Sequence, residues 1–264
     1  MLKSARTLLN TRLIKCFRWR NVIRALMADQ PADWKSFLRT YFEEGKVVLR
    51  IGEMTFTHGA KLQKDSNRLV YTPLTEKAYH FLCEARTAFR TSGIHGPAGT
   101  GKSETACMLC QDLGEEVIRI TSSDEIKLEH LVLHHKGWAV TGCTLLYDEY
   151  NRISIEVMEE AIKLIHELLN AMKDNKAEAK FGSHAFNIKQ GQRHAWVATM
   201  NPNYAGRTPL PEVHKSEGRI IEFTVPDLND ILSISLATEG IEMAEKLGPM
   251  IVNISKDAKE NLSK

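Results

Sequence analysis

A glycine-rich run, G-P-A-G-T-G-K-S at residues 96–103, constrains the fold of this chain more than any other feature. Its glycines let the backbone adopt positive φ and approach an anion closely, so that successive N–H groups converge on it. Lys102 supplies a charge for the β- and γ-phosphates of a nucleotide, and Ser103 supplies a hydroxyl for Mg²⁺. We favour a phosphate-binding loop, opening a helix from Ser103 to about Leu113, over a glycine-rich turn before a core helix. The predicted nucleotide contacts are Gly96, Pro97, Ala98, Gly99, Thr100, Gly101, Lys102, Ser103 and Glu104.

A second motif is the apolar run from Thr144 to Tyr147, which ends in Asp148 and Glu149. Such a run predicts a buried parallel strand, and the last side chains of such strands lie at the crevice where ligands bind. We expect Asp148 to hold Mg²⁺, directly or through water, and Glu149 to polarise the attacking water. Two adjacent acids also occur at turns and helix caps, but the preceding phosphate loop favours the metal site.

A third strand is predicted from Ala195 to Met200, and Asn201-Pro202 follows it. An uncharged Asn at a strand end can orient the lytic water or contact the γ-phosphate without competing for Mg²⁺. Because Asn-Pro also marks ordinary turns, this role of Asn201 depends on the other two motifs.

These segments resemble a known family. GPAGTGKSET, YDEYNRI and ATMNPNYAGRTPLP are similar to the phosphate loop, metal strand and sensor strand of the first AAA+ module of a dynein heavy chain. The run Tyr204–Thr208 is far more specific than a general ATPase motif, and the resemblance extends from about Asn10 to the C-terminus. It implies a fragment of a dynein heavy chain with an α/β AAA+ P-loop NTPase fold. Its parallel sheet carries helices on both faces, a helical linker segment precedes it and a partial helical lid follows it.

The resemblance also divides the chain. Residues 1–46 are similar to the C-terminal end of the linker, with its last helix at 33–42. Residues 47–225 are similar to the AAA+ large subdomain, and residues 226–264 to part of the small lid subdomain. In the segment that leads into the module, the residues expected to bracket adenine are Val70, Pro73 and Leu74.

Some positions depart from the family pattern. Thr121 stands where an Asn is expected to restrain the catalytic carboxylate, and residues 124–135 lack the usual Gly-Leu-Asp-Tyr run. Arg219 matches the arginine finger of AAA+ proteins, which acts on the nucleotide of a neighbouring module, but its flanking residues differ. The alternative for Arg219 is a solvated side chain at the start of a strand.

The reaction implied by the resemblance is Mg²⁺-dependent ATP hydrolysis, coupled in the intact protein to microtubule movement. The implied cofactors are ATP or ADP and Mg²⁺. Expected partners are the remaining AAA+ modules of the ring, dynein intermediate and light chains, and the microtubule, in the cytoplasm and cytoskeleton or in a ciliary or flagellar axoneme. Two alternatives stay open: a free-standing AAA+ ATPase that forms a homo-hexamer, and a module that holds nucleotide with negligible turnover. The implied catalytic residues are Glu149, Lys102, Asn201 and Arg219, and the implied metal ligands are Ser103 and Asp148.

We expect the isolated chain to bind nucleotide and to hydrolyse it slowly. The segment ending at Lys264 resembles the family just before the helix that carries the sensor arginine of the lid. A monomer also lacks the arginine finger of a neighbouring module, which is worth about 10³ to 10⁵ in rate. The apolar side chains expected to be exposed on the lid include Ile231, Leu232, Ile251 and Val252.

Composition narrows the function. A net charge of +2 argues against a dedicated nucleic-acid surface, and no apolar run is long enough for a membrane span. The five cysteines lack regular spacing, which suggests a reducing compartment. Cys107 and Cys110 have redox spacing but fall within a predicted helix, so we expect packing there. For His134-His135 we expect a helix-end or surface position in place of a zinc site.

Residues 1–28 are basic, contain no acid and interleave their charges with Leu, Ile, Val and Trp. A mitochondrial transit peptide has this character. We favour a linker helix because residues 21–26 continue directly into the linker-like segment.

The hydrophobic periodicity predicts the remaining elements in order. A helical segment covers about 5–45, an extended stretch covers 47–57 and 68–71, and a helix covers about 75–91. Further expected elements are a strand at 116–120, helices at 124–135 and 154–173, a hairpin at 181–188 with a turn near Gly191, and lid helices separated near Leu247-Gly248-Pro249.

Overall fold

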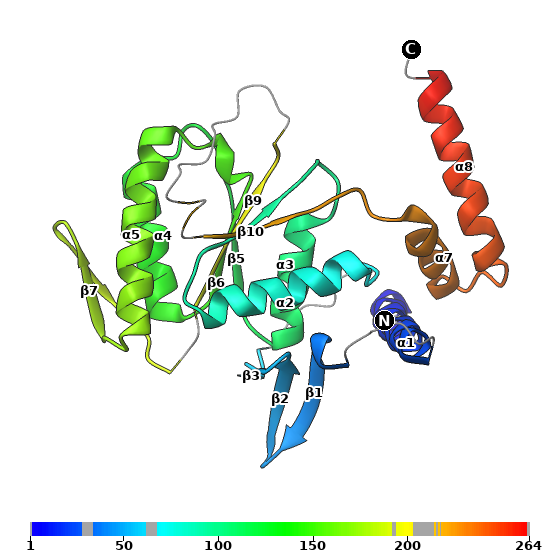
Figure 1. Cartoon of the computed structure of the whole chain (residues 1–264), viewed down its shortest axis with the longest axis horizontal. Helices are drawn as coiled ribbons and strands as arrows, with labels where there is room; N and C mark the ends of the chain where they lie inside the picture. Colours follow the sequence, from blue (N-terminus) through cyan, green and yellow to red (C-terminus); the bar gives the residue numbers. More distant parts are fainter. Residues whose placement is uncertain are drawn as a thin grey trace.

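The computed structural model describes residues 2–27, 34–61, 68–191, 194–202, 214, 216 and 218–262. A central parallel sheet lies between helices, and a small antiparallel sheet packs against the same core. A C-terminal helix pair stands to one side, next to the N-terminal helix (Figure 1). Among the described residues, none of the helices combines the length and the apolarity that crossing a membrane requires.

The central sheet consists of β4 (Ser92–His95), β5 (Val117–Thr121), β6 (Thr144–Asp148), β9 (Ala195–Met200) and β10 (Arg219–Glu222). Their order across the sheet is β10-β4-β9-β6-β5, and every neighbouring pair is parallel. Because the strands run in one direction, their carboxyl ends share one edge of the sheet. The glycine-rich loop, the acid pair and Asn201 all follow strands at that edge.

Helices cover both faces of this sheet. On one face lie α2 (Pro73–Thr87) and α3 (Lys102–Leu113), and on the other lie α4 (Leu128–Thr141) and α5 (Ile155–Lys173) (Figure 1). Side chains of β6 alternate between the two layers, since Leu146 packs on the first side and its two strand neighbours pack on the second. The structure therefore confirms the predicted α/β fold, although α4 begins and ends later than the expected 124–135.

The N-terminal segment is helical only in its first part. After α1 (Leu2–Met27) and a short 3-10 turn at Trp34–Ser36, the chain forms an antiparallel sheet. Its strands are β1 (Arg39–Glu43), β2 (Lys46–Ile51) and β3 (Met54–Thr57). The expectation of a helix continuing through residue 45, including a last linker helix, is wrong for the described residues after α1.

The residues of β1 and of the turn that follows it explain why this segment is a strand. Thr, Tyr and Phe in β1 favour extended backbone, and the hairpin register leaves Glu44-Gly45 as a two-residue turn. Both turn residues have positive φ, +49° and +76°, as such a turn requires. The predicted division after residue 46 therefore falls inside a hairpin.

A second hairpin, β7 (Glu178–Phe181) and β8 (His184–Asn187), precedes β9. Its register pairs Phe181 with His184, so the turn lies at residues 182–183 and not near Gly191 as predicted. Gly191 does have positive φ, but it follows the hairpin. The glycine of the turn is Gly182, which also has positive φ.

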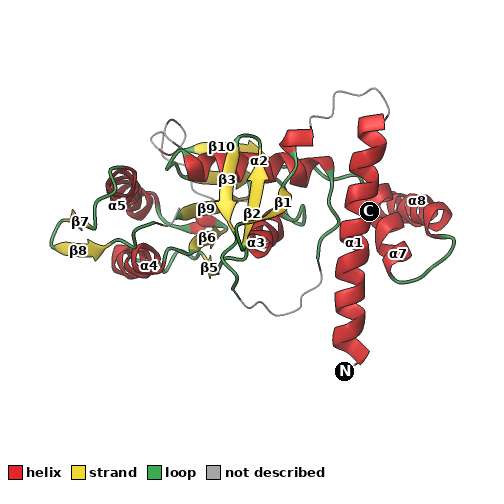
Figure 2. Ribbon diagram, turned by 90° about the horizontal axis from the view of Figure 1, so that it is seen from below, coloured by secondary structure: helices red, strands yellow, loops and turns green. Residues whose placement is uncertain are grey.

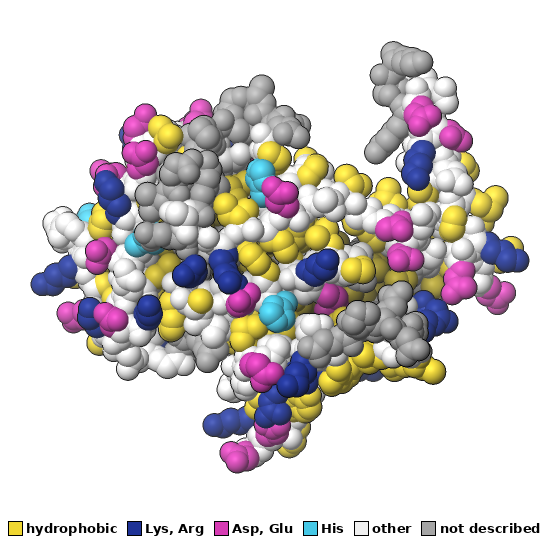
Figure 3. All heavy atoms as spheres, in the orientation of Figure 1, with side chains coloured by type: hydrophobic (Ala, Val, Ile, Leu, Met, Phe, Trp, Pro, Cys, Tyr) yellow, Lys and Arg dark blue, Asp and Glu magenta, His cyan; other side chains and the backbone are white. Residues whose placement is uncertain are grey.

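The C-terminal pair consists of α7 (Leu228–Thr238) and α8 (Ala244–Leu262). The predicted separation near residues 247–249 is wrong because Gly248 and Pro249 lie within α8. A Cβ at Gly248 would collide with Ser233 of α7, so this glycine permits close packing of the two helices. Of the four lid side chains expected to be exposed, Ile251 is exposed, Ile231 and Leu232 are half-buried and Val252 is buried. Hydrophobic side chains are visible along α8 in Figure 3.

α1 lies between the core and the C-terminal pair and contacts both (Figure 2). Arg18 of α1 donates two hydrogen bonds to Glu76 of α2, at 2.5 and 2.7 Å. At the other side, Arg6 donates to Glu239, which follows α7, at 2.6 Å. The N-terminal helix is thus tied to both parts of the molecule.

Candidate functional site

The glycine-rich loop connects β4 to α3. Gly99 and Gly101 have φ of +76° and +81°, which few side chains tolerate. A Cβ at Gly96 would collide with the carbonyl oxygen of Phe223. Glycine is therefore required at these positions by the geometry of the loop itself.

Lys102, at the first turn of α3, points back into this loop. Its ammonium donates to the carbonyl oxygens of Gly96 and Pro97, at 2.9 and 2.6 Å, and to Asn201 Oδ1 at 2.7 Å. Burial lowers the pKa of Lys102 below its ordinary value, although the carboxylates of Asp148 and Glu149 oppose that shift. The first and third sequence motifs therefore meet at one ammonium group.

Asp148 ends β6 beside Ser103. Its Oδ1 accepts hydrogen bonds from Ser103 Oγ at 2.6 Å and from Thr199 Oγ1 at 2.5 Å. Its Oδ2 accepts from Arg119 Nη2 at 2.6 Å and from Arg119 Nε at 3.1 Å. Burial alone would raise the pKa of Asp148, but these hydrogen bonds and the Arg119 charge outweigh it and hold the pKa below its ordinary value.

Glu149 is the next residue and turns out of the strand with φ of +54°. Its Oε1 accepts from Asn201 Nδ2 at 3.3 Å, and its Oε2 pairs with Arg152 Nε at 2.7 Å. Asn151 Nδ2 donates to the carbonyl oxygen of Asn201 at 3.0 Å, which holds that residue in place. Asn201 therefore lies between the ammonium of Lys102 and the carboxylate of Glu149.

Sequence reasoning missed Thr199, Arg119 and Arg152. Thr199 could have been found, because it is a polar residue in an otherwise apolar strand that ends at the site. Arg119 carried only a weak signal, a single charge within the β5 sequence V-I-R-I-T. Thr121, discussed above as a replacement for Asn, is exposed at the end of β5.

The predicted adenine segment lies next to the loop. A Cβ at Gly101 would contact Leu69 Cδ1 at 3.4 Å. Within the segment, Val70 is buried, Leu74 is half-buried and Pro73 is exposed. Arg68 anchors it to α3 through a 2.7 Å hydrogen bond to Asp112. The structure thus brings this segment to the loop, and the adenine contacts remain a prediction.

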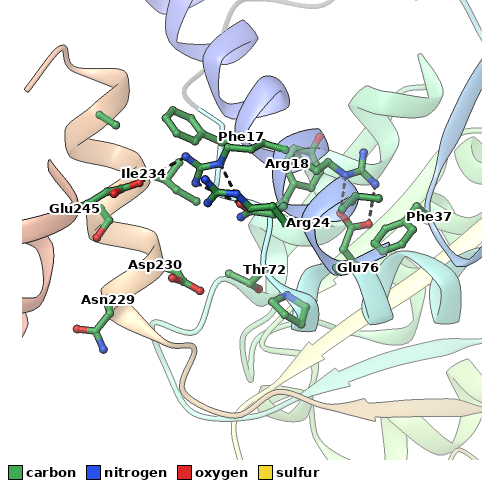
Figure 4. Close-up of a pocket in the computed structure, with 18 of the residues that line it drawn as sticks. Phe17, Arg18, Arg24, Phe37, Thr72, Glu76, Asn229, Asp230, Ile234 and Glu245 are labelled. Atoms are coloured by element: carbon green, nitrogen blue, oxygen red, sulfur yellow. Dashed lines mark hydrogen bonds and ion pairs between the residues drawn. The ribbon is translucent and has the colours of Figure 1, made fainter. Parts of the chain in front are cut away.

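A cavity of about 1550 Å³ lies between α1, α2, α7 and α8 (Figure 4). Arg18 and Glu76 lie on one side of it, and Asn229, Asp230 and Ile234 of α7 lie on the other. Its described lining includes Pro73 but none of residues 96–103, nor the acid pair of β6. The cavity therefore adjoins the predicted adenine segment without reaching the loop, and we do not assign the phosphates to it.

Arg219 starts β10 at the amino-terminal edge of the sheet, since it pairs with Ser92 at the beginning of β4. The glycine-rich loop follows the opposite end of β4. Arg219 Nη1 forms an ion pair with Glu84 of α2. The structure therefore does not bring Arg219 to the other predicted site residues, and its role as an arginine finger remains a prediction.

The remaining candidates are core residues. Cys107 and Cys110 lie in α3, half-buried and buried, and burial raises the pKa of Cys110 to about 12, which supports packing. His135 is fully buried in the middle of α4, so the predicted helix-end or surface position is wrong for it. Its Nδ1 lies 2.7 Å from the carbonyl oxygen of Leu131, and its Nε2 accepts from Trp196 Nε1 at 3.2 Å. The longer α4 and this polar pairing explain the difference.

Two side-chain oxygens at the site are suitable ligands for Mg²⁺. Ser103 Oγ and Asp148 Oδ1 lie 2.6 Å apart, and Mg²⁺ is usually bound through one or two such protein oxygens together with phosphates and water. No group of three or more His, Cys, Asp and Glu side chains suited to a metal occurs in the described part of the chain. Ser103 Oγ and Asp148 Oδ1 therefore fit a Mg²⁺ ion whose remaining ligands are phosphates and water.

The sheet order, the phosphate-binding loop after β4 and the polar residues at the ends of β6 and β9 define a P-loop NTPase of the AAA+ class. The chain belongs to the family of the hydrolytic ATP-binding site of the dynein motor region, which residues 58–264 match. This confirms the resemblance found in the sequence motifs.

Individual relatives agree. Dynein axonemal heavy chain 2 of Mus musculus is 35% identical over 245 residues, covering 90% of this chain and 5% of that protein. Dynein axonemal heavy chain 10 of Homo sapiens is 32% identical over 269 residues, covering 99% and 6%. The cytoplasmic dynein heavy chain of Dictyostelium discoideum is 30% identical over 256 residues, covering 92% and 5%. The chain therefore spans only about one twentieth of the length of these relatives.

Proposed function

We propose that this chain binds ATP together with Mg²⁺ at residues 96–104 and hydrolyses it, as the motor module of a dynein heavy chain. The observation that carries this proposal is the meeting of Lys102, Asn201 and Glu149 through direct hydrogen bonds. Residues from three separate motifs converge on the space beside the loop. This is the arrangement that phosphoryl transfer to water needs.

In the proposed reaction, Lys102 exchanges its contacts with the loop carbonyls for the phosphate oxygens. Ser103 and Asp148 would hold Mg²⁺, which supplies charge neutralisation at the phosphates. Glu149 accepts a proton from the attacking water, and Asn201 orients that water from the neighbouring strand. Val70, Pro73 and Leu74 bracket the adenine ring.

At the level of the whole protein, we propose that hydrolysis drives microtubule-based movement within a ring of AAA+ modules. Intermediate and light chains would be further partners, and the cytoplasm, cytoskeleton or axoneme the site of action. The C-terminal end of the linker would be residues 1–46, the large subdomain residues 47–225 and the partial lid residues 226–264. Arg219 would act on the nucleotide of the adjacent module. The chain alone would lack the matching arginine from a neighbour, so we expect its turnover to be below about 1 s⁻¹, the lower end of typical enzyme rates.

Isothermal titration calorimetry with Mg·ADP tests the nucleotide site. Lys102→Ala removes a charged donor to phosphate, worth about 1.5–3 kcal/mol, so affinity should fall roughly ten- to more than hundredfold. Lys163→Ala, on the exposed side of α5, is the matched control and should bind like the wild type. Equal affinity of Lys102→Ala and the wild type would overturn the assignment.

A further inference from the structure

Arg119 places a permanent cation on the carboxylate that would bind the metal. Its guanidinium donates to Asp148 Oδ2 through two nitrogens, at 2.6 and 3.1 Å, and its third nitrogen donates to Glu104 Oε1 at 2.8 Å. Both contacts to Asp148 share one oxygen, and hydrogen bonds between charged groups are stronger than those between neutral groups. Arg119 therefore engages Oδ2 of Asp148, while Oδ1 accepts from Ser103 and Thr199.

A divalent cation and a guanidinium compete for one carboxylate. Both lower the energy of the negative charge on Asp148, and each repels the other at the short distances that simultaneous binding would require. Arg119 takes no part in the hydrolysis proposed above. Its contact with Asp148 nevertheless opposes the binding of Mg²⁺ at that residue.

The surroundings of Arg119 let it leave Asp148 without leaving the site. Its side chain is 42% exposed, and β5 is the edge strand of the central sheet as described. Glu104, 57% exposed on the first turn of α3, is a second carboxylate within reach. After it leaves Asp148, the guanidinium keeps a charged partner and access to water, so the exchange carries only a small desolvation cost.

We propose that Arg119, held on Oδ2 of Asp148, must withdraw toward Glu104 when Mg·nucleotide binds, so that it sets the Mg²⁺ affinity of the site. The proposal rests on the nucleotide-binding function above and makes Arg119 a positioning residue, not a catalytic one. Its consequence is a site that binds Mg²⁺ more weakly than Ser103 and Asp148 alone would.

The test is a Mg²⁺ titration of the 264-residue chain with a fluorescent N-methylanthraniloyl-ADP, starting in EDTA. Arg119→Met should lower the Mg²⁺ concentration at half-maximal signal about three- to tenfold, as expected for loss of a partly exposed charged pair. Arg119→Lys, which keeps the charge but not the guanidinium, should fall between Arg119→Met and the wild type. Mn²⁺ binding followed by electron paramagnetic resonance gives the same order without any turnover.

Arg50→Met is the matched control. Arg50 is similarly exposed, at 40%, and pairs with the carboxylate of Glu43 within the antiparallel sheet. It should change the midpoint less than about twofold, since a screened charge acts weakly. An equal shift in Arg50→Met and Arg119→Met, or no shift in Arg119→Met, would overturn the inference.

Failure of the inference is distinct from failure of the proposed function. If the midpoints are unchanged but Lys102→Ala still weakens nucleotide binding, only the role of Arg119 is lost. If the labelled ADP does not bind to any variant at any Mg²⁺ concentration, the nucleotide site itself is wrong. Circular dichroism of each variant establishes folding, and Arg119→Lys decides the question if Arg119→Met does not fold.

Discussion

Two Arg–Asp pairs of nearly equal length serve this molecule differently. Arg68 and Asp112, 2.7 Å apart, are 9% and 7% exposed and join the segment before α2 to α3. Arg119 and Asp148, 2.6 Å apart, are 42% and 16% exposed and lie at the proposed nucleotide site. The chemical groups are the same, so burial and the remaining partners decide what each pair does.

Asp112 is surrounded by donors. Besides Arg68, it accepts from the hydroxyls of Tyr71 and Tyr79 at 2.7 and 3.0 Å, and Lys15 of α1 lies 3.5 Å away. Burial would raise its pKa, but the charges of Arg68 and Lys15 and the hydrogen bonds outweigh it and lower the pKa. A buried carboxylate with all its partners inside the protein holds two elements together, whereas the partner of Asp148 is partly exposed and can be replaced by a ligand.

The largest expected effect is on the rate of ATP hydrolysis at the site that contains Asp148. Glu149→Gln keeps the shape of the side chain but cannot accept a proton, so single-turnover ATP hydrolysis should fall roughly 10²- to 10⁴-fold while Mg·ATP still binds. Glu160→Gln on the surface of α5 is the control and should hydrolyse at the wild-type rate. Unchanged turnover in Glu149→Gln would show that another residue prepares the water.

The next largest effect concerns stability. Asp112→Ala leaves Arg68 buried without its carboxylate and should lower the free energy of unfolding by about 3–5 kcal/mol. Asp148→Ala breaks a pair of the same chemistry, but Arg119 can return to water, so the loss should be below about 1 kcal/mol. Urea denaturation of both variants gives the comparison. Similar losses would mean that exposure does not separate the two pairs.

A smaller effect is the pH dependence of stability that comes from the buried imidazole of His135. Burial lowers the pKa of His135 from 6.5 to about 4, so the unfolded chain takes up a proton between these values and the folded chain does not. The stability that His135 contributes is full above pH 6.5 and should be lost, by roughly 3 kcal/mol, as the pH falls to about 4.

Urea denaturation from pH 7 to pH 4 measures this slope. His135→Gln, which can still accept from Trp196, should flatten it, and substitution of the exposed His184 should leave it unchanged. His214, whose pKa is also lowered to about 4, should supply the slope that remains, so a slope undiminished in His135→Gln would contradict the prediction.

The sequence predicted best what local chemistry controls. The loop, the acid pair and Asn201 lie where strand ends were expected, because glycine geometry and apolar strands act over a few residues. β2 and β3 match the extended stretch predicted at 47–57, but β1 was missed because a charged-aromatic run fits either a helix or a strand until the Glu44-Gly45 turn is known. The contact between Arg119 and Asp148 could not be predicted, since it depends on β5 pairing with β6 from a distant part of the chain.

The backbone conformation of Glu149 limits how far the stability of this site can be raised. Its φ of +54° is a conformation that costs a non-glycine residue of order 1–3 kcal/mol, and its backbone N–H donates to Thr199 Oγ1 at 3.2 Å from that position. Glycine at 149 would relieve the strain and remove the carboxylate. Under the proposed function, stability of the fold and turnover therefore place opposite demands on this one residue, and a thermostable version of the chain should keep Glu149.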